Sequence, residues 1–243
     1  MSQNNTAPLG IILLGVFIAL GLSASGYFVG QMMYNAKVAV NTAEAKGLAE
    51  RRVEADTANW TLRFDLAGGA NANIPALYKQ AEKHQQTIIS LLKENGFTDD
   101  EIKIGVIDYR YQEFRNSSQQ LVDQKHILAG SVNVETAKVR QIEKVRGNVN
   151  KLIAEGINIQ NTPPKYYFTG LNDIKPDMLR EATQNARIAA NEFASNAGVK
   201  VGSIRSARQG SFFIRDVGSE YSDSEKIEKD VRVVTTIDFY LTD

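Results

Sequence analysis

The chain of 243 residues has no cysteine, two histidines and one tryptophan. Without cysteine it can form no disulfide, no thiolate nucleophile and no zinc site with Cys ligands. His84 and His126 cannot build a histidine-rich metal site within one subunit. His84 is open to two interpretations, a buried switch or ligand, or a hydrogen-bonded residue at the rim of an apolar helix face. His126 opens a strand and has no acidic neighbour nearer than Asp123. We expect no metal and no organic cofactor.

The motifs of common enzyme classes are also missing. The sequence contains no G-x-S-x-G, H-E-x-x-H, Walker loop or G-x-G-x-x-G. Asp99-Asp100-Glu101 is either a weak calcium site or a solvated turn before a strand. Gly68-Gly69 is either an anion-binding nest or a plain turn. We expect no catalytic residues and a protein that is not an enzyme.

Charge of one sign is not in excess. Lys and Arg total 28, as do Asp and Glu, so no global field favours a polyanion. Aromatic residues occur on strand-like segments without basic residues interleaved, which predicts no nucleic-acid partner. They are either ordinary sheet packing or a contiguous exposed surface. These residues are Tyr109, Tyr111, Tyr166, Tyr167, Phe168, Phe212 and Phe213.

The first charged residue of the chain is Lys37. A bilayer core requires about 20 apolar residues of helix, and residues 9–33 supply them. A signal peptide would have a basic start and a shorter apolar core. Cleavage after Ala19-x-Gly21 is the alternative, but apolar residues continue to Met33. We therefore predict a retained transmembrane anchor over residues 1–35, with membrane lipid as its partner.

Small residues recur within this segment at spacings of three and four. They would share one face of a helix, where close backbone approach lets membrane helices associate. The alternative is that Gly and Ala are simply common in membrane helices. The predicted association residues are Gly15, Ala19, Ser23, Gly26 and Gly30.

Hydrophobic periodicity in the remaining residues predicts an α+β fold. A strand with alternating apolar residues occupies 55–68. It is followed by a helix (75–94), two strands (101–114 and 125–135), a helix (136–155), an extended piece (158–170), a helix from Pro176 to Asn196, and strands over 199–216 and 228–242. The order is a split β-α-β-β-α-β unit followed by α-β-β, mainly antiparallel. One domain of residues 36–243 results, with parts meeting at about residue 170.

Three local expectations accompany this assignment. Composition over residues 36–54 slightly favours an extended helix, although alternation of Val38, Val40 and Thr42 also fits a strand. The charged segment 217–227 is expected to be a mobile loop. The inward stripe of the last helix is predicted to be Leu179, Ala182, Ala186, Ala189, Phe193 and Ala197.

Four stretches then resemble the SIMPL family: "EAKGLAERRVEADTANWTLRF", "KENGFTDDEIKIGVIDY", "EATQNARIAANEFASNAGVKVGSI" and "VRVVTTIDFYL". They carry an acidic-Ala-x-hydrophobic strand at Asp56–Trp60, a Gly96–Ile102 turn after a helix, and an Ala-rich helix running into Gly198–Gly202. The similarity covers about residues 40–243. It implies a first strand at 40–47, against composition.

The resemblance also implies a function. Bacterial members are typically envelope proteins, some assemble into ring- or channel-like homo-oligomers, and some are linked to protection against oxidative stress. No functional residues transfer. Lys37, Lys46, Arg51 and Arg52 would by themselves favour a cytoplasmic domain, whereas the resemblance favours the periplasm. We expect a single-pass protein of the inner (cytoplasmic) membrane, facing the periplasm, which assembles as a homo-oligomer of more than two copies. A channel-like pore or a small-ligand-binding device is the alternative, and the ligand is unknown.

Overall fold

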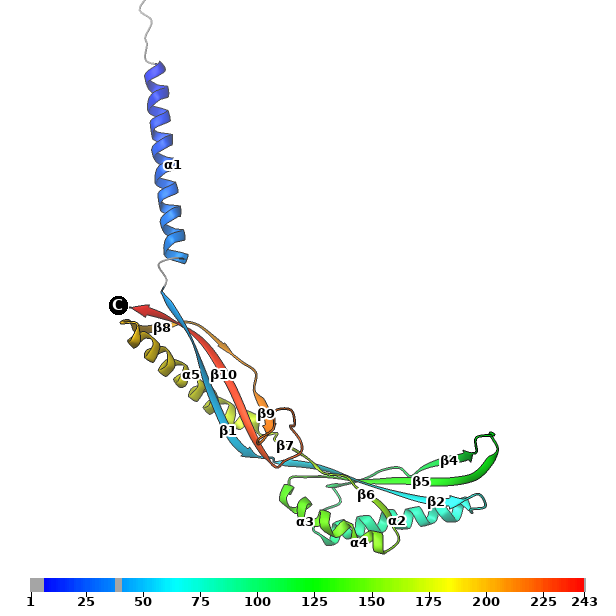
Figure 1. The fold of residues 1–243 in the computed structure, drawn as a ribbon. Helices are drawn as coiled ribbons and strands as arrows, with labels where there is room; N and C mark the ends of the chain where they lie inside the picture. The colour runs from blue at the N-terminus through cyan, green and yellow to red at the C-terminus, as the bar shows by residue number, and fades with distance from the viewer. Residues whose placement is uncertain (1–6, 38–40, 243) are drawn as a thin grey trace, which may run out of the picture. The chain divides into compact units, whose positions relative to one another are not determined.

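The computed structural model describes residues 7–37 and 41–242 (Figure 1). An isolated helix, α1 (Ala7–Lys37), precedes an α+β region whose strand pairs are antiparallel, as predicted. The remaining elements are β1 (Thr42–Glu54), β2 (Thr57–Gly69), α2 (Ile74–Glu94), β3 (Ile102–Ile104), β4 (Asp108–Arg115), β5 (Leu121–Thr136), α3 (Val139–Val149), α4 (Lys151–Ala154), β6 (Asn158–Asn161), β7 (Lys165–Tyr167), α5 (Leu171–Asn196), β8 (Lys200–Gln209), β9 (Phe213–Asp216) and β10 (Glu228–Thr242).

Backbone contacts divide the chain into two units. The first contains residues 1–48, 179–210 and 234–243, and the second contains residues 49–178 and 211–233. The chain passes from one to the other within β1, α5 and β10. The sequence instead divides the domain at about residue 170 into two parts that follow one another along the chain. This division stays a prediction.

The first unit packs α5 on a sheet whose strand order is β1-β10-β8. Its core combines Ala45, Ala186 and Ala190 with Ile237 and Phe239. The strand assignment implied for residues 40–47 is confirmed from Thr42, while residue 40 lies outside the described residues. β1 alternates buried and exposed positions because one face lies against the helix.

Small side chains let α5 approach β1 closely. A Cβ added to Gly47 would lie 1.8 Å from the Ala182 carbonyl oxygen, so only glycine fits there. The buried stripe of α5 follows strict i, i+4 steps and differs from the predicted one. Ala182 and Ala186 are confirmed, but Leu179 is only half-buried, and Ala189, Phe193 and Ala197 are exposed. The residues buried instead are Met178, Ala190 and Ala194.

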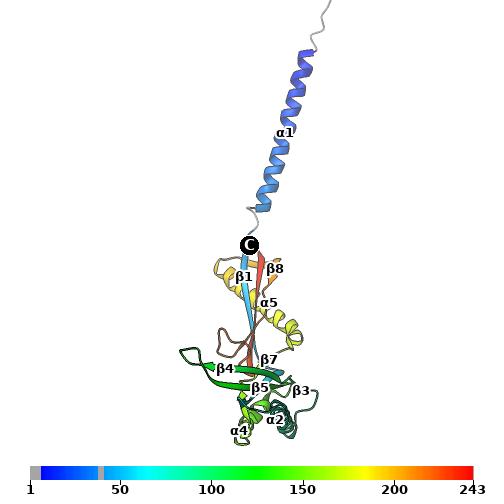
Figure 2. The same cartoon turned by 90° about the vertical axis from the view of Figure 1, so that its right-hand side faces the viewer.

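The second unit contains a six-stranded sheet. Its order is β3-β5-β2-β6, with β4 also pairing with β5 and β7 also pairing with β2. The predicted alternation of β2 is confirmed, because Ala58, Trp60, Leu62 and Phe64 are fully buried. Figure 1 shows helices α2, α3 and α4 on one side of this sheet, and Figure 2 shows α2 and α4 there as well. The other face of the sheet is left open.

Two predicted elements are interrupted. The strand expected over 101–114 is divided into β3 and β4, because Gly105 lies against Ser131: its N–H donates to the Ser131 carbonyl over 2.9 Å, and an added Cβ would meet the Ser131 Oγ at 2.1 Å. The side-chain amide of buried Gln85 donates hydrogen bonds to the Gly105 carbonyl and to the Ser131 carbonyl. The helix expected over 136–155 begins at Val139 and is interrupted at Asn150, giving α3 and α4.

The start of α5 also differs from the prediction. The helix begins at Leu171, so Pro176 lies inside it and not in its first turn. The distant Asp56 explains this start, since its carboxylate accepts hydrogen bonds from the Thr169 N–H, the Thr169 hydroxyl and the Gly170 N–H over 2.9–3.0 Å. Burial alone would raise the pKa of Asp56, but these hydrogen bonds lower it.

The extended piece predicted over 158–170 contains Pro163 and Pro164, which are compatible only with an edge or kinked strand, and it forms two short strands at an edge of the sheet. β6 and β7 each pair with β2 alone, and Pro163 and Pro164 lie between them outside either strand.

Candidate functional site

The two histidines lie in different environments. The His84 ring contacts Phe64 edge-to-face, its Nδ1 is buried without a hydrogen-bond partner, and burial lowers its pKa. The hydrogen bond expected of His84 as a rim residue is therefore absent at Nδ1. His126 accompanies Tyr109 and Tyr111 on the β4–β5 hairpin, with 2.8 Å between Tyr109 Oη and His126 Nδ1. Of the two histidines, His126 is the one that belongs to a cluster of aromatic side chains on the hairpin, with Tyr109 and Tyr111.

The carboxylates of 99–101 are separated by their partners. Asp99 pairs with Lys93 at 2.6 Å. Glu101 accepts hydrogen bonds from Thr136 and Lys138. Burial would raise the Glu101 pKa, but these bonds and the Lys138 charge hold it at about 2. No group of three or more His, Cys, Asp or Glu residues that could hold a metal ion occurs within residues 7–37 and 41–242. Glu101 instead joins the turn before β3 to the end of β5.

The aromatic residues named from the sequence do not form one surface. Tyr166 is buried, and Tyr167 and Phe213 are exposed on β7 and β9. Phe168 and Phe212 are half-buried. The rings of Tyr109 and Tyr111 contact that of His126.

The β4–β5 hairpin exposes apolar side chains on a two-stranded ribbon. β2 pairs with β5 only from Lys125 onward, so residues 113–124 lie beyond it. Figure 1 shows this hairpin extending past the end of β2. Its exposed large apolar side chains are Tyr109, Tyr111, Phe114, Leu121 and Val122. A lone two-stranded ribbon is only marginally stable in water, so this ribbon would gain stability from a further contact.

The open face of the same sheet carries two adjoining polar hollows. They measure about 750 and 570 Å³ and share Asp65 and Arg110, whose charged groups are 3.9 Å apart. Gln160 also donates to Asp65. Arg63 lines the larger hollow and Lys125 the smaller. The mixed charge suits a small polar ligand better than a strong anion.

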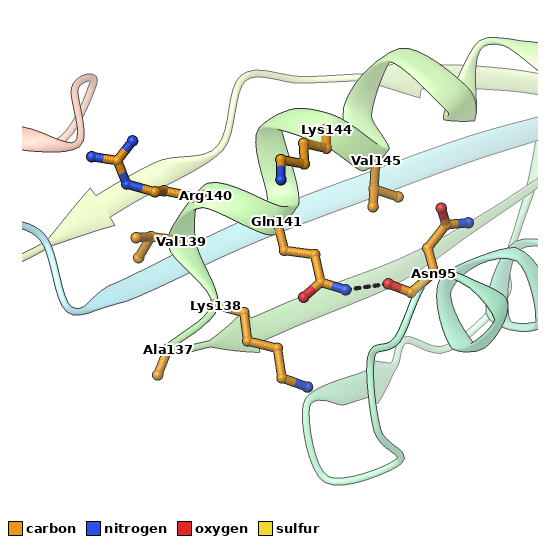
Figure 3. A pocket seen from close by; sticks show the side chains of 8 residues that line it. All are labelled: Asn95, Ala137, Lys138, Val139, Arg140, Gln141, Lys144 and Val145. Atoms are coloured by element: carbon orange, nitrogen blue, oxygen red, sulfur yellow. Dashed lines mark hydrogen bonds between the residues drawn. The ribbon is translucent and has the colours of Figure 1, made fainter.

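A third hollow of about 610 Å³ lies at the start of α3 (Figure 3). Lys138, Arg140 and Lys144 are its charged lining residues, and no carboxylate lines it. Lys138 pairs with Glu101 and Arg140 with Glu54. Gln141 donates to the Asn95 carbonyl across its wall.

The segment predicted to be a mobile loop is extensively hydrogen-bonded. Asp216 and Lys229 form a fully buried ion pair at 2.5 Å at its base. Asp216 also accepts from the Ser222 hydroxyl and the Glu225 N–H, and Lys229 donates to the Asp223 carbonyl. Burial would raise the Asp216 pKa, but these partners hold it at about 2. Sequence reasoning missed this site, although the alternation of β10 places Lys229 on the same face as Val231 and Val233.

Comparison with known families completes this description. The family model described as "SIMPL: Protein of unknown function (DUF541)" matches residues 44–239, which is most of the chain. The chain belongs to the SIMPL family. A search among curated proteins found no match.

In this SIMPL protein the matched segment begins within β1 and ends within β10, so α1 lies outside it. Residues 10–34 of α1 have a mean hydropathy of 2.1 and are long and apolar enough to cross a membrane. A Cβ added at Gly15, Gly26 or Gly30 would meet nothing within 4 Å. The helix is thus a candidate anchor, and helix association through its small residues stays a prediction.

Proposed function

We propose that this SIMPL protein is a non-catalytic assembly protein anchored by α1 in the inner membrane. Copies associate into a ring- or cage-like homo-oligomer of more than two subunits on the periplasmic side. The observation that supports this best is the β4–β5 hairpin, which presents Phe114, Leu121 and Val122 to solvent. Apolar side chains exposed together are typical of interaction surfaces.

Two further features support self-association. β1 and β8 are the outer strands of their sheet, and unprotected edges pair readily with other chains. The small-residue stripe of α1 offers a contact within the membrane. The resemblance is to a family that includes envelope proteins linked to oxidative stress. It supports a protective role in envelope or oxidative stress.

The mass of the full-length protein in detergent tests the assembly. Multi-angle light scattering should give more than two copies. Phe114→Glu combined with Val122→Glu places carboxylates on the hairpin and should lower that mass. Ile188→Glu changes an exposed apolar residue of α5 and should leave it unchanged. A monomeric wild type would refute the assembly, and an unaffected hairpin variant would refute the role of the hairpin.

Anchor and orientation have separate tests. The intact mass of membrane-extracted protein should include residues 1–33, and a loss of about 20–25 N-terminal residues would indicate a cleaved signal peptide. Protease added to spheroplasts should digest residues 36–243. Digestion only after lysis would place the domain in the cytoplasm.

A small-ligand-binding device is the second candidate function. The polar hollows around Asp65 and Arg110 favour it. Arg110→Ala should then weaken binding of a small zwitterionic probe, such as an amino acid, measured by calorimetry. A wild type that binds none of a panel of such probes would contradict this candidate.

A further inference from the structure

Tyr221 lies at the tip of the 217–227 loop and is 95% exposed. Within the described part of the chain, no other large apolar or aromatic side chain is as exposed. Aromatic residues of this kind dominate protein–protein contacts, because they bury a large area and also offer a polar group. An exposed aromatic residue on a disordered tail would not indicate a binding surface. The exposure of Tyr221 therefore indicates one only if the loop that carries it is ordered.

The loop is fixed in one conformation from its base. Besides the buried Asp216–Lys229 pair, the Asp216 N–H donates to the Ser222 carbonyl over 2.9 Å, and the Ser222 N–H donates to the Ser219 hydroxyl over 2.9 Å. These bonds bracket Tyr221 on both sides. A loop ordered before binding loses little conformational entropy when it docks. The structure thus holds a large aromatic side chain in solvent on a fixed support.

The charge of the loop indicates what kind of surface it fits. Glu220, Asp223 and Glu225 lie close to Tyr221 in the sequence, and Lys226 is the single cation between residues 217 and 227. A complementary surface would have an apolar base for the ring and positive charge at its rim.

The hollow at the start of α3 has these properties. Ala137, Val139 and Val145 supply apolar lining, and its charged lining residues are all cations. Figure 3 shows Lys144 projecting from α3 beside Gln141. Lys138 and Arg140 have Glu partners, whereas Lys144 is exposed and has no ion pair among the described residues. Lys144 is therefore available to a carboxylate from outside.

We infer that the Tyr221 loop of one copy docks into the α3 hollow of a second copy, with the Tyr221 ring against the exposed Ala137 and with Glu220 near Lys144. This deepens the proposed function and rests on it. The two halves of the contact are different patches, so the contact is heterologous. Such a contact forms a ring when its rotation closes.

Cross-linking between two single-cysteine variants tests the contact directly, because the chain has no cysteine of its own. Asp223→Cys on the loop and Ala137→Cys in the lining of the hollow leave Tyr221, Glu220 and Lys144 in place. The two variants are separately expressed in full length, mixed in detergent and treated with a short bis-maleimide. We expect a heterodimer band from the mixture and much less from either variant alone. Ser195→Cys, on the exposed side of α5, replaces Ala137→Cys as the control and should give no such band. Equal cross-linking with the control would overturn the inference.

A charge exchange provides the second arm. Lys144→Glu and Glu220→Lys should each weaken association several-fold, and the double variant should recover most of it. Tyr221→Ala should weaken association about thirtyfold, as expected for a central aromatic contact. The three positions altered, Lys144, Glu220 and Tyr221, are exposed, and the folding of each variant is checked by Trp60 fluorescence. An oligomeric wild type with unaffected Tyr221→Ala would overturn this contact alone, whereas a monomeric wild type would overturn the proposed function as well.

Discussion

Replacing Lys229 by methionine removes one charge of a fully buried ion pair while keeping a side chain of similar length. Asp216 would then be a buried carboxylate without a cation. Removing one partner of a buried pair costs about 3–5 kcal/mol. Asp216 keeps its hydrogen bonds from Ser222 and Glu225, which favours the lower end of that range. A loss of about 3 kcal/mol is a large part of the 5–15 kcal/mol typical of folded domains.

Trp60 can report this loss of stability, because it lies in the second unit, which also contains Lys229. It is the single tryptophan of the chain, it is fully buried, and its Nε1–H donates to the Thr162 carbonyl over 3.0 Å. With a urea dependence of about 1–3 kcal/mol per molar, Lys229→Met should lower the midpoint of Trp60 fluorescence by about 1–3 M. Lys226→Met makes the same change at an exposed lysine of the loop and should shift it far less. Equal shifts for the two variants would refute the reasoning.

Two further outcomes are expected. The pKa values of Asp216 and Glu101 lie at about 2, below the ordinary values of 3.8 and 4.5, so their stabilisation is complete above about pH 4.5 and lost as the pH falls toward 2. Urea midpoints should fall over that window, and Glu101→Gln should flatten the fall; a curve unchanged by this variant would argue against Glu101. Gly47→Ala should destabilise the first unit by about 1–3 kcal/mol, because the new methyl meets the Ala182 carbonyl. Hydrogen exchange in β1 and α5 would show it, and Gly69→Ala, where a Cβ meets nothing within 4 Å, should leave exchange unchanged.

Local sequence patterns predicted the elements that bury one face and expose the other. β2 was predictable because its buried residues alternate along one strand. The division between β3 and β4 was not, because it depends on the approach of Gly105 to Ser131, far along the chain. The start of α5 was missed for a similar reason, since the carboxylate that holds it belongs to Asp56. Long-range partners of this kind leave no periodic signal.

The candidate surfaces were less predictable than the fold. Aromatic residues on strands were singled out from the sequence, but only pairing of β4 with β5 brings Tyr109 and Tyr111 to His126. The 217–227 segment looked unstructured because it is polar and charged. Its order comes from Lys229, which alternation places on the buried face of the last strand with Val231 and Val233. That position was not used, because lysine is seldom fully buried.

The pairing of β1 with β10 has a consequence for biosynthesis. The strand that follows the apolar helix emerges first, and its partner is completed only when the last residues of the chain have been made. Until then the edge of β1 that pairs with β10 has no partner. Contacts this distant in sequence also make folding slow. A protein truncated before residue 228 would therefore have no partner for its first strand, so a product of incomplete synthesis would be exposed to proteases and fail to accumulate.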